Sequence, residues 1–161
     1  MRSLGLLCGF ALVISLGCEE SAAEPATPDQ AVVRDGRAIA GVLATDEAEE
    51  PARRAEVLLL ERRGVLAGET MREEVVVELL RVNAALEALT LHSEPGRAWR
   101  EQAVAAYEAR VDALRRQAEL LEATDAEGWP YLEAIQDERT AVIRVGAVSG
   151  AIEELGTTSG D

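Results

Sequence analysis

Two runs of apolar residues follow the spacing of one face of an α-helix. The first run steps alternately by four and three positions, through Val75, Leu79, Val82, Leu86 and Leu89. The second run has a similar spacing, through Val104, Tyr107, Val111, Leu114, Ala118 and Leu121. Such a spacing gathers apolar side chains on one side of a helix, where they must be buried against another element. The chain is therefore expected to fold as helices packed on helices.

Composition supports an all-α fold over one that contains sheets. Aromatic residues make up only 3% of the chain, and Ala, Leu, Val, Glu and Arg dominate. These residues favour helices, and the Val-rich runs lack the flanking turn residues of strands. We expect an antiparallel bundle of four main helices with a short, weak leading helix, formed by residues 27–155. The expected helices run from Pro28 to Leu43, from Ala52 to about Ala67, from about Met71 to Leu91, from the Ser93 cap through Leu121, and from near Trp129 or Tyr131 to about Leu155.

Local signals set the expected helix ends. Thr27 followed by Pro28 and Gln30 is typical of a helix start, and Ser93 before Pro95 is a second cap candidate. Gly68 is expected to stop one helix, and a capping box from Thr70 to Glu73 to begin the next. Further expectations are a capping box over residues 124–127, interruptions of the leading helix at Gly36 and Gly41, and a disordered tail at 156–161.

Residues 1–20 have the features of an export signal. Arg2 provides a positive charge, Leu4–Leu16 is an uncharged apolar run, and the small residue Gly17 precedes Cys18. This arrangement resembles the signal peptide of bacterial lipoproteins, with Ser15 at a position where that class usually has Leu. Cys8 does not fit, because it follows the bulky Leu7. An ordinary secretory signal and an uncleaved anchor are the alternatives, although an anchor needs about 20 apolar residues to span the membrane.

The resemblance implies a covalent lipid anchor. Residues 1–17 would be removed, Cys18 would carry the lipid, and residues 18–26 would form a flexible tether. Several acyl chains hold a protein stably at a membrane, whereas a single chain does not. The implied location is the bacterial cell envelope, facing the periplasm. Glu19 is not the aspartate associated with inner-membrane retention in this class, which favours the outer membrane.

Charge excludes one class of partner. The formal net charge is −14, and removal of Arg2 with the signal would make it −15. A strongly acidic protein repels nucleic-acid phosphates, so we expect no nucleic-acid partner. A processed chain would keep only Cys18, which rules out an intramolecular disulfide.

No catalytic, metal-binding or cofactor-binding pattern is recognisable. His92 is the only histidine, and it is expected in a solvated turn without partner ligands. Glu73, Glu74 and Glu78 lack a calcium-loop pattern, and acidic residues at a helix start already have a role there. No GxSxG motif is present. We therefore expect a non-enzymatic protein with no cofactor.

Two regions are candidates for binding. Ala141–Ile152 is almost free of polar residues and is too short, at about 18 Å, to cross a bilayer. It is either a buried central helix or a surface for a second copy or another envelope protein, and its contact candidates are Ala141, Val142, Val145, Gly146, Val148, Gly150 and Ile152. The alternative function is a bundle that encloses a small apolar ligand, lined by Trp99, Tyr107 and Trp129.

Overall fold

The computed structural model describes residues 27–123 and 128–158, and this part of the chain contains helices and no strand. The all-α fold predicted from the sequence is thereby confirmed. The elements are α1 (Pro28–Leu43), α2 (Glu49–Leu60), α3 (Gly64–Thr70), a short π-helical segment η1 (Met71–Val75), α4 (Val76–Glu87), α5 (Glu94–Glu122) and α6 (Trp129–Thr158).

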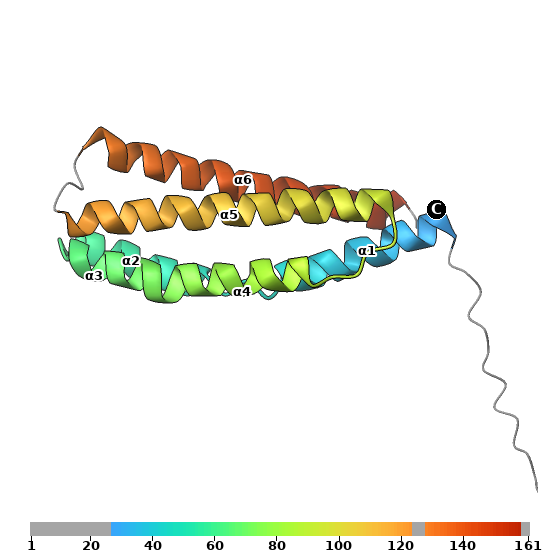
Figure 1. The fold of residues 1–161 in the computed structure, drawn as a ribbon, viewed down its shortest axis with the longest axis horizontal. Helices are drawn as coiled ribbons and strands as arrows, with labels where there is room; N and C mark the ends of the chain where they lie inside the picture. Colours follow the sequence, from blue (N-terminus) through green and yellow to red (C-terminus); the bar gives the residue numbers. More distant parts are fainter. Residues whose placement is uncertain (1–26, 124–127, 159–161) are drawn as a thin grey trace, which may run out of the picture.

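The helices form an elongated antiparallel bundle (Figure 1). α1 and α2 follow one another along one side of the bundle, and the run α3–η1–α4 returns in the opposite direction. α5 and α6 then form a long antiparallel pair. α5 is central, because it packs against α1, α3, η1, α4 and α6.

The leading helix is more substantial than the sequence suggested. α1 has 16 residues and packs against α4, α5 and α6. The expected capping box is present, since the Thr27 hydroxyl accepts a hydrogen bond from the Gln30 N–H and the Gln30 side chain accepts one from the Thr27 N–H. Ile39 is fully buried. Gly36 and Gly41 do not interrupt α1, because packing against neighbouring helices stabilises α1 in addition to the helix propensity of its residues.

The expected helix Ala52–Ala67 is wrong, because α2 ends at Leu60. The Arg63 N–H donates to the Leu58 carbonyl and the Arg62 N–H to the Leu59 carbonyl, which is the Schellman pattern of a helix end. Arg62 adopts the left-handed conformation with φ of 60°. Glycine usually occupies that position, so the sequence carried no signal for this end.

The expected stop at Gly68 and restart at Thr70 are also wrong. The chain stays helical from Gly64 through η1 into α4. Thr70 has helical backbone angles, and its hydroxyl donates to the Leu66 carbonyl rather than capping a helix. A Cβ added at Gly68 would lie 3.1 Å from the Ala118 carbonyl oxygen. Gly68 therefore permits the close approach of α3 to α5 instead of ending a helix.

The remaining helix ends lie closer to expectation. Ser93 caps α5, since its hydroxyl accepts a hydrogen bond from the Gly96 N–H. α4 ends at Glu87, before the expected Leu91, and α6 continues past the expected Leu155 to Thr158. The capping box proposed for residues 124–127 and the tail after 158 lie outside the described residues, as do the signal segment, Cys18 and the tether.

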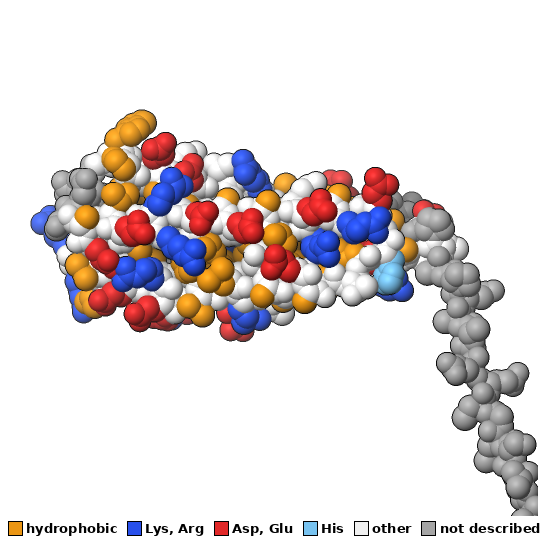
Figure 2. Space-filling view, viewed as in Figure 1, with side chains coloured by type: hydrophobic (Ala, Val, Ile, Leu, Met, Phe, Trp, Pro, Cys, Tyr) orange, Lys and Arg blue, Asp and Glu red, His pale blue; other side chains and the backbone are white. Residues whose placement is uncertain are grey.

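The two apolar runs form the core. Their members are buried, apart from Leu89 and Val104, which are half-buried and pack against the same core. Charged side chains of both signs are spread over the visible face of the bundle, with apolar side chains between them (Figure 2). None of the described helices combines the length and the apolar character needed to cross a membrane.

Candidate binding groove

A groove separates α2 from α6. α2 packs against α3 and η1, whereas α6 packs against α5 and α1. Within the described residues, the backbones of α2 and α6 do not approach each other closely. Side chains of α5 and η1 form the floor between these two walls.

One half of the groove is mixed in character, because Gln117 of α5, Glu56 of α2 and the pair Glu138 and Arg139 of α6 line it together with apolar residues. This hollow has a volume of about 230 Å³ and a floor that includes Leu114 of α5 and Val75 of η1. Its α2 wall is formed by Ala52, Ala55 and Leu59, and its α6 wall by Tyr131 and Ile135. The volume lies below the roughly 300–1,000 Å³ of pockets that enclose small ligands. The hollow suits a few inserted side chains better than a whole small molecule.

The other half of the groove is lined by charged side chains. It is a hollow of about 440 Å³ with four carboxylates and two arginines along it, namely Asp46, Glu49, Glu56, Glu138, Arg53 and Arg110. Ala52, Glu56 and Glu138 line both hollows, so the two are continuous. Arg139 adds a positive charge to the smaller hollow.

A polar network fixes the end of the groove next to the α1–α2 connection. The Tyr107 hydroxyl donates to Asp46 Oδ2 at 2.8 Å, and Arg110 lies 3.4 Å from both that oxygen and Glu138 Oε1. Burial raises the pKa of Tyr107, and the hydrogen bond and negative charge of Asp46 raise it further. Tyr107 therefore stays protonated as a donor, and the Asp46 carboxylate remains fixed to α5.

Two residues of α4 hold the same connection from the other side. Glu78 accepts a hydrogen bond from the Glu47 N–H at 3.1 Å, and Arg81 donates to the Thr45 carbonyl. The hydrogen bond from Arg81 keeps the pKa of Glu78 below its ordinary value, with a smaller contribution from the Glu47 N–H. The beginning of α2, one wall of the groove, is thus positioned by contacts to α4 and α5.

The structure divides the contact candidates of Ala141–Ile152 between two faces of α6. Four of them point into the bundle, where Val145 is half-buried and the others are buried: Ala141, Val145, Val148 and Ile152. Val142 is 44% exposed, and a Cβ added at Gly146 or Gly150 would meet nothing within 4 Å.

The outward candidates extend one wall of the groove. Val142 and Gly146 follow Ile135 and Arg139 at steps of three and four, so helical spacing places these four residues on one flank of α6. Gly150 follows one turn later. The predicted segment therefore continues the α6 flank beyond the residues that line the groove, a relationship that the sequence alone did not reveal.

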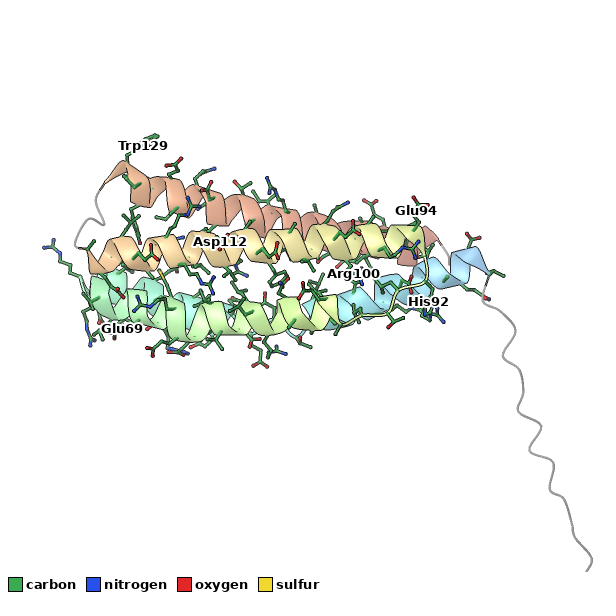
Figure 3. All side chains as sticks on the ribbon, in the orientation of Figure 1. Glu69, His92, Glu94, Arg100, Asp112 and Trp129 are labelled. Atoms are coloured by element: carbon green, nitrogen blue, oxygen red, sulfur yellow. The ribbon has the colours of Figure 1, made fainter. Side chains whose placement is uncertain are left out.

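The three aromatic ligand candidates do not line one cavity. Tyr107 is 1% exposed in the core, whereas Trp129 is 78% exposed and projects from the start of α6 (Figure 3). Trp99 is half-buried near the start of α5, beside α1 and close to Gly36. At 1.5 Å per residue, α5 covers about 35 Å between Trp99 and the end where α6 begins.

Two of the three carboxylates considered as metal ligands, Glu74 and Glu78, form ion pairs with arginines. Glu74 pairs with Arg54, and Glu78 with Arg81. His92 is exposed in the α4–α5 connection (Figure 3), where its backbone N–H donates to Asp35. The part of the chain that the structure describes contains no group of three or more His, Cys, Asp or Glu side chains arranged to hold a metal ion.

Sequence reasoning missed the residues that build the groove. In the sequence, Asp46 and Arg110 resemble ordinary surface charges. Their contacts join distant parts of the chain, since Asp46 lies 61 positions from Tyr107 and 64 positions from Arg110. Ala52 and Ala55 carried no distinctive signal. No known protein family, curated protein or solved structure matches the chain.

Proposed function

We propose that this protein is a lipid-anchored, non-enzymatic module of the bacterial cell envelope that binds a helix of another protein or of a second copy. The observation that supports binding is the groove left open between α2 and α6, whose walls carry the half-buried apolar residues Leu59 and Ile135 beside charged side chains. Grooves of this kind receive the apolar face of an amphipathic helix. The lipobox-like segment ending at Cys18 supports the anchor.

The order of the elements suits such a role. Attachment of a lipid at Cys18 would keep the start of α1 near the membrane, because Pro28 follows ten positions later in the chain. α1 has 16 residues and is about 24 Å long, and the groove begins beyond it, at the α1–α2 connection. The binding surface would then stand away from the lipid surface, where a periplasmic partner could reach it.

Membrane fractionation tests the anchor. Full-length protein is expected in the membrane fraction and to incorporate a labelled fatty acid, whereas Cys18→Ser is expected to lose both properties. Cys8→Ser is the matched control, because it removes the other cysteine of the same segment. A Cys18→Ser protein that stayed in the membrane and kept the label would refute the anchor.

Site-specific crosslinking in cells tests the binding surface. A photoreactive amino acid at position 142 should give a covalent adduct with another chain, because Val142 is exposed on the groove flank of α6. The control position is 101, where the exposed Glu101 on α5 lines neither half of the groove. Equal adduct yields at the two positions would argue against the groove as the binding surface.

The alternative function, a helical bundle that binds a small apolar ligand, gains no comparable support. Its expected lining residues lie in the core, at one end of α5 and on the surface of α6. A ligand screen that changed the fluorescence of Trp99 without crosslinking at position 142 would favour it.

A further inference from the structure

The charges along the groove indicate the chemistry of its occupant. Glu56 lines both hollows and is exposed, and it has no ion pair or side-chain hydrogen bond within the described residues. Glu49 also lines the polar half without a direct ion pair there. By contrast, Arg53 pairs with Glu50, and Arg110 with Asp46 and Glu138. The α2 wall therefore presents two carboxylates, Glu49 and Glu56, that have no ion pair within the described residues, with Arg53 between them.

The whole molecule reinforces this local charge. With a formal net charge of −14, a second copy would be repelled as it approached the groove. A partner with basic side chains would be attracted, and its charges would meet the carboxylates of α2.

We propose that the groove binds an amphipathic helix of another protein, with apolar residues between Leu59 of α2 and Ile135 of α6 and with Lys or Arg residues facing Glu49 and Glu56 on α2. This inference rests on the proposed binding function and specifies the partner. Because α2 has 12 residues, a contacting helix of about three turns, roughly 18 Å long, matches the wall. Arg139 on the opposite wall favours an acidic residue on the other flank of that helix.

Synthetic peptides supply the probe. The first peptide is a 14-residue helix with leucines on one face, lysines on one flank and a glutamate on the other. The second has glutamates in place of the lysines, and the third has the composition of the first in scrambled order. Fluorescence anisotropy with full-length purified protein should give binding of the first peptide about tenfold or more tighter than of either other peptide. Added salt should weaken it.

Two variants locate the binding on the protein. Glu56→Arg should weaken binding of the first peptide by about tenfold, because it places like charges opposite each other. Ala52→Leu should also weaken it, because the larger side chain fills the hollow at a residue that lines both halves. Glu101→Arg makes the same charge change outside the groove and should leave binding unchanged. Circular dichroism and thermal unfolding verify that each variant is folded.

Several results would overturn the proposal. Equal binding of the scrambled peptide would mean that charge alone drives association, and unchanged binding by Glu56→Arg and Ala52→Leu would place the peptide elsewhere. Dimerisation of the protein through position 142 would identify a second copy as the occupant. If the peptides fail while crosslinking at position 142 and membrane attachment succeed, the proposed function stands and only the basic partner is refuted.

Discussion

Asp35 in α1 accepts hydrogen bonds from both the backbone N–H and the hydroxyl of Ser93, at 2.6 and 2.7 Å. The same oxygen accepts a third hydrogen bond from the His92 N–H at 2.8 Å. Asp35 is 1% exposed, and Ser93 in turn caps α5 by accepting from the Gly96 N–H. One carboxylate thus joins the first helix to the connection between α4 and α5 and orients the cap of α5, the central helix of the bundle.

Asp35→Ala should destabilise the fold strongly. It would leave two backbone N–H groups without their acceptor in a mostly buried place, at a cost of about 3 kcal/mol in the free energy of unfolding. Chemical denaturation followed by circular dichroism measures the change. Asp112→Ala is the control, since Asp112 is 74% exposed and 4.0 Å from its partner Arg115. A similar small effect of both substitutions would contradict the role given to Asp35.

The contribution of Asp35 should depend on pH. Burial alone would raise its pKa, but the hydrogen bonds from Ser93 and His92 outweigh burial and bring it below the ordinary value of 3.8. Because the pKa is lower in the folded state, the stabilisation is fully present above about pH 4 and is lost as the pH falls through the folded value. The difference in unfolding free energy between wild type and Asp35→Ala should therefore shrink below pH 4. A difference that is constant from pH 6 to pH 2 would contradict this linkage.

Gly96→Ala should destabilise the protein although alanine is the better helix former. A Cβ at position 96 would lie 2.6 Å from the Asp35 Cβ and 2.8 Å from the Ser93 hydroxyl oxygen, so the two helices would have to separate. The matched control is Gly41→Ala in α1, where the added Cβ meets nothing within 4 Å. That control should stabilise the protein by about 0.5–1 kcal/mol, the helix-propensity difference. Thermal unfolding should move the two midpoints in opposite directions.

Arg62→Gly should stabilise the bend between α2 and α3. Arg62 has φ of 60°, a conformation that costs a residue with a side chain about 1–2 kcal/mol and costs glycine little. Part of this gain is lost to the greater freedom of glycine in the unfolded chain, so we expect a net increase of about 0.5 kcal/mol. Arg63→Gly, one position later, is the control and should give no increase. Denaturant midpoints compare the two variants, and a lower midpoint for Arg62→Gly would show that its side chain matters more than its backbone strain.

Features that depend on near neighbours in the chain were predictable. The caps at Thr27 and Ser93 form because a short polar side chain meets an N–H three positions later, a contact that any helix start with those residues permits. The apolar runs became the core for a similar reason, since periodicity fixes which residues share a face of a helix.

Features that depend on packing were not predictable. Gly68 had the sequence signature of a helix stop, yet α5 lies so close that glycine is needed there within a helix. The helix α2 in fact ends at Leu60, and the bend after it places Arg62 in the left-handed conformation, which is unfavourable for a residue with a side chain. The segment Ala141–Ile152 has few polar residues in the sequence, and only its packing against α5 and α1 decided that Val148 is buried while Val142 remains exposed.

The sequence by itself determined that this chain forms helices, which of their faces are apolar and where two of them begin, because these properties arise from residues within one or two turns of each other. Tertiary structure alone decided that α2 and α6 stay apart and that Asp35 and Asp46 join distant segments. Those outcomes depend on contacts between residues far apart in the chain, whose geometry exists only once the helices have packed.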